Sequence, residues 1–236
     1  MCSWAGEDAL LFEYEASIDP SVNRKVRLLA AAIEQARFVS VIEVVPAYRS
    51  LMVYFDPEEA NVAELTQSIT RLASGPNEAQ LPDPRVFRVP TVYGTTHAPD
   101  LARVAEAAGM TSEQVVEMFS SQRYAVYCLG FLCCLAYMGG VPRRLQLPRL
   151  ATPRPRLPAG SVGLAGAQAV MLPIDQPSGF HFIGRTFVTL YDPARFPPTW
   201  IRPGDLVQCP AVSEKEALGW KGRPLGDCIV EGVSRS

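Results

Sequence analysis

The sequence predicts an α+β protein with an N-terminal α/β domain and a β-rich second domain. Strand and helix patterns alternate over the first 90 residues, whereas most of the 21 prolines lie between Pro142 and Pro210. Proline removes a backbone donor and fixes φ, so the proline-rich region cannot be mostly helical. The domains are expected at residues 1–90 and 91–212, and residues 213–236 form either a loosely packed tail or a last strand around Cys228–Val233.

The N-terminal domain is predicted from an ordered series of strands and helices. Asp19 caps the first helix and Pro20 takes its first position, which favours proline. Apolar residues at helical spacing give that helix one buried face. The expected elements are, in order, the strand Ala9–Glu15, the helix from Asp19, the strands Val39–Val45 and Arg49–Asp56, the helix Asn61–Leu72 and the strand Val86–Pro90. This β-α-β-β-α-β order is that of a ferredoxin-like domain.

The second domain is expected to open with two short helices. Leu101–Ala108 is helical in pattern and Gly109 is placed to end it. Thr111 and Gln114 form a capping-box pattern at the start of the next helix. Beyond Phe119 the sequence predicts strands, turns and loops rich in proline and glycine, in a barrel-like arrangement.

Composition excludes several classes of function. The net charge of −2, without a basic stripe, argues against nucleic acid as a partner. Neither His97 nor His181 stands at zinc-finger spacing from a cysteine pair, so no metal site is expected. The N-terminus carries no visible secretory signal, and the six cysteines are expected to be reduced thiols of a cytoplasmic protein. No nucleophile elbow or phosphate-binding loop is present, which argues against an enzyme acting alone.

A long stretch without charge, Tyr124–Val141, has three possible interpretations. It reaches the lower length limit of a membrane span, but its glycines, tyrosines and cysteines are poor drivers of insertion. The adjacent Cys133 and Cys134 could form a thiol site, although no basic residue lies nearby in the sequence to lower a thiol pKa. The preferred interpretation is a buried strand that leads into the wall of a binding pocket, with no membrane as partner.

Three arginines follow this stretch closely. Arg149, Arg154 and Arg156 carry planar donors suited to carboxylate or phosphate, and the last two share a face if the segment is extended. Ser161 could add a hydroxyl donor. The alternative is that the arginines form a solvated edge or ion pairs with one of three carboxylates, those of Asp175, Asp192 and Asp205.

The chain resembles a known family over nearly its whole length. The residues that carry the resemblance read GF…AYMGGVP, LQLPRLATPRPRLPAGSVGLAGAQ, PSGFHFIGRT, LYDP and RPGDLV. They are similar to the allophanate hydrolase subunit 1 family, which includes the B-type subunit of bacterial ATP-dependent 5-oxoprolinase and an inhibitor of a sporulation histidine kinase. The stretch from Pro148 to Gln168 is the longest and most specific part of the match.

The resemblance implies a fold, partners and a site. The second domain is expected to be a cyclophilin-like β-barrel, and a homologous C-type sister subunit is expected as partner, with a third subunit possible. Mg-dependent ATP, shared with the partner, would drive the opening of 5-oxoproline to glutamate. The implied catalytic residues are Arg154, Arg156 and Ser161, and the implied substrate- or nucleotide-binding residues are Tyr137, Arg149, Gln168 and Arg185.

The chain departs from the family pattern at several positions. A histidine, two glycines and a threonine of the family are replaced by Phe119, Cys134, Val170 and Ala169, and the family's SPGGW becomes Gln176–Phe180. We therefore expect a retained fold with an altered pocket. The main hypothesis is a non-autonomous subunit of an ATP-hydrolysing amidohydrolase; the alternatives are a catalytically degenerate regulator that binds a histidine kinase, and a stabilising partner of a catalytic sister chain.

Overall fold

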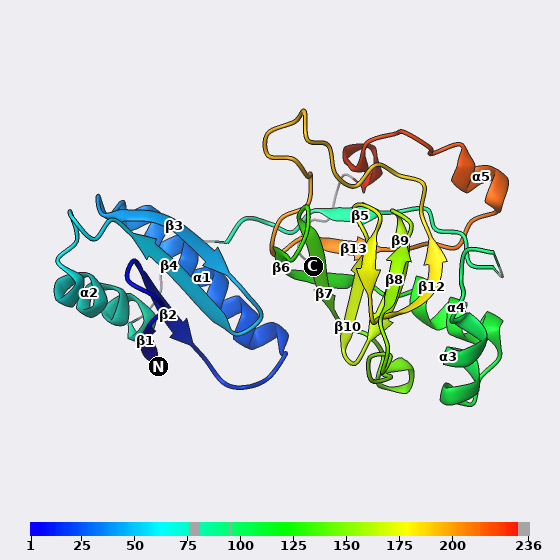
Figure 1. Cartoon of the computed structure of the whole chain (residues 1–236), viewed down its shortest axis with the longest axis horizontal. Coiled ribbons are helices and arrows are strands. Elements are labelled where there is room, and N and C mark those ends of the chain that lie inside the picture. The colour runs from blue at the N-terminus through cyan, green and yellow to red at the C-terminus, as the bar shows by residue number, and fades with distance from the viewer. Residues whose placement is uncertain (76–80, 95, 231–236) are drawn as a thin grey trace. The chain divides into compact units, whose positions relative to one another are not determined.

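The computed structural model describes residues 1–75, 81–94 and 96–230. The chain divides into two compact units, Met1–Asp83 and Pro84–Ser236 (Figure 1). Each unit has its own cluster of buried apolar side chains, so each is described by itself.

The first unit is a four-stranded antiparallel sheet with two helices. The strands lie in the order β1-β2-β4-β3, and α1 and α2 pack their apolar residues into the same core as β2 and β4. The elements are β1 (Cys2–Trp4), β2 (Ala9–Glu13), α1 (Pro20–Ala36), β3 (Val41–Pro46), β4 (Ser50–Phe55) and α2 (Val62–Ser74).

Local signals in the sequence explain the helices of this unit. The Asp19 carboxylate accepts a hydrogen bond from the Ser21 amide at 2.8 Å, which confirms the predicted N-cap, and Pro20 is the first helical residue. Asn61 caps α2 through the amide of Glu64. The buried residues of α1 include the predicted stripe, which is Val22, Val26, Leu29 and Ile33.

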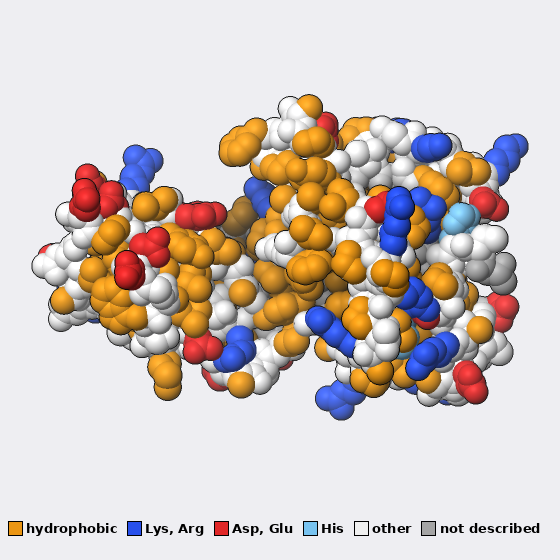
Figure 2. Space-filling model, viewed as in Figure 1, with side chains coloured by type: hydrophobic (Ala, Val, Ile, Leu, Met, Phe, Trp, Pro, Cys, Tyr) orange, Lys and Arg blue, Asp and Glu red, His pale blue; other side chains and the backbone are white. Residues whose placement is uncertain are grey.

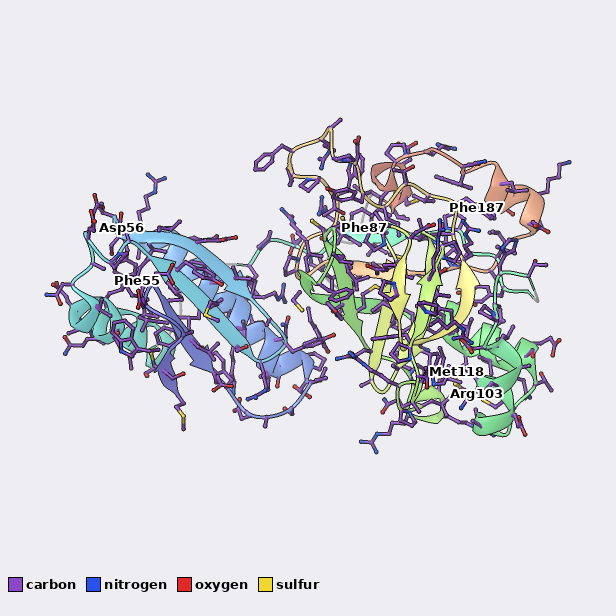
Figure 3. All side chains as sticks on the ribbon, viewed as in Figure 1. Phe55, Asp56, Phe87, Arg103, Met118 and Phe187 are labelled. Atoms are coloured by element: carbon purple, nitrogen blue, oxygen red, sulfur yellow. The ribbon has the colours of Figure 1, made fainter. Side chains whose placement is uncertain are left out.

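The predicted last strand of the N-terminal domain belongs to the second unit. Val86–Arg88 forms β5, which pairs in parallel with β13 (Leu206–Gln208) and antiparallel with β14 (Ile229–Val230). Figure 3 labels Phe87 on this strand and Phe55 on β4 of the first unit. In the first unit β1 occupies the place beside β2 instead. A short strand that is buried on both faces has the same sequence pattern in either sheet, so the pattern alone could not assign it.

The second unit is built on an eight-stranded sheet. Its strand order is β12-β9-β10-β7-β6-β13-β5-β14, and β8 and β11 form a separate two-stranded sheet. The remaining elements are α3 (Leu101–Ala108), α4 (Ser112–Ser120), β6 (Tyr124–Gly130), β7 (Leu135–Gly139), the 3₁₀ helix η1 (Arg143–Leu145), β8 (Arg154–Leu157), β9 (Ser161–Ala165), β10 (Gln168–Met171), β11 (Gln176–Ser178), β12 (His181–Arg185), α5 (Glu214–Leu218) and the 3₁₀ helix η2 (Leu225–Cys228).

The eight-stranded sheet is curled into a half-barrel. Val92, in the segment that follows β5, exchanges two backbone hydrogen bonds with Arg185 of β12, at 2.8 and 2.9 Å. The edge strand β12 therefore pairs with the segment that follows β5, although β5 lies near the opposite edge of the sheet. This curl encloses the larger apolar core, to which α3 and α4 contribute Val104, Val115 and Phe119.

The helix signals in the second unit are confirmed. Gly109 ends α3 in the left-handed conformation, at a φ of 61°, and the Thr111–Gln114 capping box is complete, with both hydrogen bonds present. The described part of the C-terminal segment contains α5, η2 and β14. Of the predicted last strand at Cys228–Val233, β14 covers Ile229–Val230, and residues 231–233 lie outside the described residues.

The uncharged stretch Tyr124–Val141 forms the hairpin of β6 and β7. The predicted buried strand is confirmed as β6, and the second strand, β7, was not predicted. The Tyr124 ring is fully buried and its hydroxyl donates a hydrogen bond to the Phe119 carbonyl at 2.8 Å. Among the described residues, no helix has the length and apolar character needed to cross a bilayer. All six cysteines are free thiols.

The turn between β6 and β7 holds non-glycine residues in a conformation that glycine prefers. Phe131, Cys133 and Cys134 have φ values of 56°, 47° and 61°. An L-residue in this region carries a steric cost that glycine does not. Replacing Cys134 by glycine is therefore expected to raise the free energy of unfolding by about 1 kcal/mol.

Urea denaturation of the purified chain would measure this gain. The matched control is Cys134→Ser, which also removes the thiol but keeps a side chain at positive φ, and it is expected to give no gain. A stabilisation that appears equally in both variants would assign the effect to loss of the thiol and contradict the backbone explanation.

Candidate functional site

A pocket of about 310 Å³ opens on the second unit. Its walls come from the β6–β7 turn, β7, β10, the loop before β8, and β11 with the residues that follow it. The residues that line it are Phe131, Leu135, Tyr137, Arg149, Pro153, Val170, Gln176, Pro177, Ser178, Gly179 and Phe180. Most of these are apolar or aromatic, with a few polar groups, which is the usual composition of a small-molecule site.

Arg149 and Tyr137 supply the cation and a hydroxyl of the pocket. The guanidinium carbon of Arg149 lies 5.0 Å from the centre of the Phe180 ring, in cation–π contact. Burial raises the pKa of the Tyr137 hydroxyl, and the positive charge of Arg149 partly opposes this. Tyr137 therefore stays protonated at neutral pH and keeps its capacity to donate a hydrogen bond.

Gln176 is the buried polar residue of the pocket wall. Its side chain is only 3% exposed, and neither its amide nitrogen nor its amide oxygen has a hydrogen-bond partner among the described residues. Buried amides in folded proteins are nearly always paired, so an unpaired one requires an explanation. The nearby His181 is also buried; one ring nitrogen lies 2.8 Å from the Pro148 carbonyl oxygen.

Arg154, predicted as a catalytic residue, forms a structural ion pair. Its guanidinium binds both carboxylate oxygens of Asp100, one of them at 2.9 Å, and that carboxylate also accepts the Phe182 amide at 2.7 Å. Asp100 is buried at the start of α3, where its side chain makes no capping bond. The pair therefore links β8, α3 and β12, and the guanidinium charge is already balanced.

Arg156 also has a carboxylate partner. It lies 2.8 Å from Asp175, and the two side chains are 80% and 44% exposed. Hydrogen bonds from the Ala159 amide and the Arg156 side chain lower the pKa of Asp175. Arg156 therefore forms one of the ion pairs that the sequence offered as an alternative to an anion site, the pair with Asp175.

The other three predicted site residues have local partners. The Ser161 hydroxyl is buried and donates a hydrogen bond to the Pro158 carbonyl at 2.7 Å. Gln168 begins β10, opposite Gly139 and Ala165 in the neighbouring strands. Arg185 donates to the Ala159 carbonyl at 3.1 Å and its guanidinium carbon lies 5.0 Å from the centre of the Phe187 ring.

Of the seven predicted site residues, the structure brings Tyr137 and Arg149 to the pocket. Basic side chains gather over the second unit near β8 and β12 (Figure 2). Among the arginines of these strands, Arg154 and Arg156 bind carboxylates and Arg185 donates to a backbone carbonyl. The roles of the other five residues remain predictions. Sequence reasoning did not select Gln176 or Phe180 as site residues, although both lie in the segment noted for its departure from the family pattern.

Two of the four single-residue departures from the family lie away from the pocket. Phe119 and Ala169 are fully buried in the larger core of the second unit. Val170 does line the pocket, and Cys134 lies in the adjacent turn. The departures that can alter the pocket are therefore Val170 and the segment from Gln176 to Phe180.

The three arginines that the sequence singled out have different surroundings. Arg154 and Arg156 bind carboxylates, whereas Arg149 is the cation of a largely apolar pocket. A phosphate-binding role of these arginines stays a prediction.

Fold and site together define a two-unit α/β protein whose second unit is a curled sheet with a small-molecule pocket. Residues 1–201 match the model of the carboxyltransferase domain, subdomain C and D, and the chain belongs to this family. The resemblance to the family of allophanate hydrolase subunit 1 and the B-type subunit of 5-oxoprolinase is thereby confirmed.

Particular relatives match nearly the whole chain. The chain is 35% identical to the B-type subunit of 5-oxoprolinase from Bacillus subtilis (strain 168), over 92% of this chain and 94% of the relative. It is 36% identical to the protein of the same name from Escherichia coli O157:H7, over 92% and 97%. Among solved structures, TTHA0988 superposes with a TM-score of 0.76 at 30% identity; the match covers 87% of this chain and 40% of TTHA0988.

Proposed function

We propose that this chain is the B-type component of an ATP-dependent amidolyase that opens 5-oxoproline to glutamate. The observation that carries the proposal is the match, at 35% and 36% identity and nearly full length, to two proteins named as the B-type subunit of 5-oxoprolinase. The pocket of the second unit supports it, because its volume and composition suit a small organic ligand. The proposed place of action is the cytoplasm, and the proposed second domain fold is a cyclophilin-like barrel.

The active enzyme in this proposal is a complex with a homologous C-type sister subunit. A stable lactam requires activation before hydrolysis, which is the part assigned to ATP. Mg-dependent ATP is proposed to be shared with the partner subunit, and the proposed catalytic residues Arg154 and Arg156 pair with Asp100 and Asp175 in the structure of this chain. This chain would contribute the pocket that holds the organic substrate.

An affinity purification of the tagged chain from its native organism, under reducing conditions, tests the proposal. Mass spectrometry is expected to recover a C-type sister subunit in near-equal amount, and the complex is expected to hydrolyse ATP only when 5-oxoproline is present. The isolated chain is the control and is expected to be inactive. Recovery of the sister subunit in a complex that shows no 5-oxoproline-dependent ATP hydrolysis would contradict the proposed substrate.

A regulator that binds other proteins is the second candidate. It is favoured by Val170, which places a side chain in the pocket wall at a family glycine position. The same purification separates the two candidates, because this one predicts recovery of a histidine kinase or another regulator without the sister subunit.

A further inference from the structure

We propose that the turn between β6 and β7 is a binding site for a soft monovalent metal ion, copper(I), with sulfur ligands alone. The thiolates of Cys133 and Cys134 are the two principal ligands, and the thioether of Met171 is the third. None of these residues lines the pocket around Arg149, and the site needs no partner subunit, so it is independent of the proposed function. The evidence is the placement of three sulfur-bearing side chains in one small region of the second unit.

Cys133 and Cys134 are the two central residues of a tight turn. The Leu135 amide closes this turn by donating a hydrogen bond to the Leu132 carbonyl at 3.0 Å, and both cysteines have positive φ. Both are free thiols and half-buried, whereas three of the other four cysteines are buried. The pair is therefore within reach of an ion from solvent.

The spacing of the pair favours chelation of a metal ion over a disulfide. Adjacent Cα atoms joined by a trans peptide lie about 3.8 Å apart, which is below the usual range of about 4.4–6.8 Å for a disulfide. A disulfide between Cys133 and Cys134 would therefore be strained. A metal ion about 2.3 Å from each sulfur holds the two sulfurs farther apart than the ~2.05 Å of an S–S bond. Adjacent cysteines meet this wider spacing more easily.

Met171 brings a third sulfur-bearing side chain to the pair. It lies on β10 opposite Ala136, which follows Cys134 by two residues. Met171 and Cys134 line the same small cavity, whose other walls are mostly apolar and include Leu190 and Leu225. A thioether is a soft, neutral ligand. The apolar walls would keep water from one side of an ion held between these sulfurs.

The ligand set favours copper(I) over zinc(II). Structural zinc sites usually have four ligands from cysteine, histidine or carboxylate side chains. Among the described residues, no group of three or more such side chains is placed to hold a metal ion. Two thiolates and one thioether are soft ligands, and soft ligands select copper(I). Two Cu–S bonds form to the thiolates while both thiol protons pass to solvent, so one cation and two thiolates give a complex with one negative charge.

The Tyr191 hydroxyl lies beside the two thiols. Desolvation raises the pKa of this hydroxyl, and the charges of Cys133 and Cys134 raise it further. Tyr191 therefore stays protonated at neutral pH and can donate a hydrogen bond to a metal-bound thiolate. Such a bond would offset part of the negative charge of the complex and orient the ligand.

Copper(I) titration of the purified full-length chain tests the proposal. The titration is done without oxygen and in competition with a chromophoric copper(I) chelator. The wild-type chain is expected to bind one copper(I) ion, and X-ray absorption at the copper edge is expected to show sulfur neighbours alone, at about 2.3 Å. Zinc(II) is the comparison ion, and at equal concentration it is expected not to displace copper(I) from the site.

Five variants assign the ligands. Cys133→Ser and Cys134→Ser each remove one thiolate and are expected to weaken copper(I) binding at least ~100-fold, since loss of a residue that only supports a metal ligand already costs about 10–100-fold. Met171→Leu conserves volume and removes the thioether, and Tyr191→Phe removes the hydroxyl; each is expected to weaken binding about 10-fold. Cys2→Ser, which removes a half-buried thiol of the first unit, is the control and is expected to bind like wild type.

The outcomes decide between this site and adventitious binding to thiols. Binding that persists in both serine variants, or nitrogen and oxygen neighbours around the copper, would overturn the proposal. Unchanged binding in Met171→Leu would overturn the part assigned to the thioether. A single ion lost in either serine variant and kept in Cys2→Ser would support the site, whatever the activity of an assembled complex. The absorption spectrum is recorded on the wild-type chain, so the test stays decisive if a variant fails to fold.

Discussion

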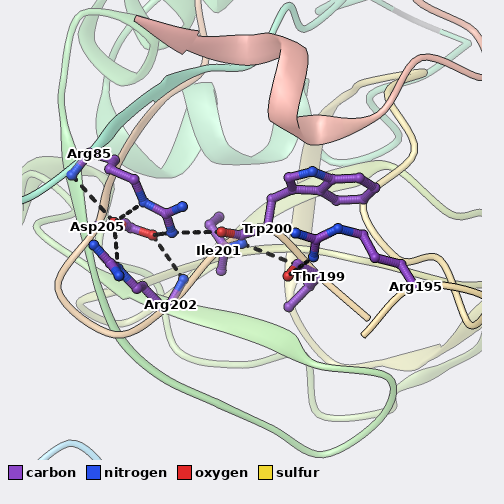
Figure 4. A network of polar contacts seen from close by, with 7 residues as sticks. All are labelled: Arg85, Arg195, Thr199, Trp200, Ile201, Arg202 and Asp205. Atoms are coloured by element: carbon purple, nitrogen blue, oxygen red, sulfur yellow. Dashed lines mark hydrogen bonds and ion pairs between the residues drawn. The ribbon is translucent and has the colours of Figure 1, made fainter. Parts of the chain in front are cut away.

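Replacing Asp205 by alanine is expected to lower the free energy of unfolding of the second unit by about 3–5 kcal/mol. The Asp205 carboxylate is 1% exposed and binds the Arg85 side chain at 2.6 and 3.1 Å (Figure 4). It also accepts the backbone amides of Arg85 and Arg202. Its loss would leave two amides without this acceptor and a partly buried guanidinium without its counter-charge, with the Trp200 carbonyl as its remaining acceptor.

Urea denaturation followed by tryptophan fluorescence measures this effect. Trp200 and Trp220 lie in the second unit, so the exposed Trp4 of the first unit is replaced by phenylalanine in every variant to isolate the signal. Asp227→Ala, which breaks an exposed pair with Arg223, is the control and is expected to change stability by less than about 0.5 kcal/mol. An equal effect of the two substitutions would contradict the importance assigned to burial.

Replacing Arg154 by alanine is expected to lower the free energy of unfolding by about 3 kcal/mol. The variant leaves the Asp100 carboxylate buried at 3% exposure with the Phe182 amide as its remaining hydrogen-bond donor. The cost arises mainly from this unbalanced charge, because the lost attraction is offset in part by the solvation that Arg154 regains. The same fluorescence measurement detects it.

Arg156 provides a matched control on the same strand. Arg156→Ala removes an equal side chain two residues away, but its pair with Asp175 is exposed, so stability is expected to remain nearly unchanged. Similar losses in both variants would show that β8 is sensitive to truncation in general. Arg154→Ala could also reduce turnover in an assembled complex. If the variant is destabilised as expected, that reduced turnover would be explained by displacement of β8 and α3.

The sequence by itself determined the elements whose signals are local. Asp19 and Pro20 start α1, Thr111 and Gln114 start α4, and Gly109 ends α3, because each of these interactions spans a single turn of chain. The buried character of β6 also followed from its apolar residues. The resemblance to the family came from residues distributed over the whole chain, so it did not depend on knowing how they pack.

Only the tertiary structure decided which residues meet across long sequence separations. Arg154 pairs with Asp100, 54 residues away, and that aspartate has the sequence pattern of a helix cap. β5 lies in the second sheet because β13, more than 100 residues later, supplies its parallel neighbour. The side-chain amide of Gln176 lacks hydrogen-bond partners because of how the surrounding elements pack, which the sequence pattern does not reveal. Local patterns determine where helices and strands form, whereas the pairing of charges and the contents of a pocket depend on how those elements pack in three dimensions.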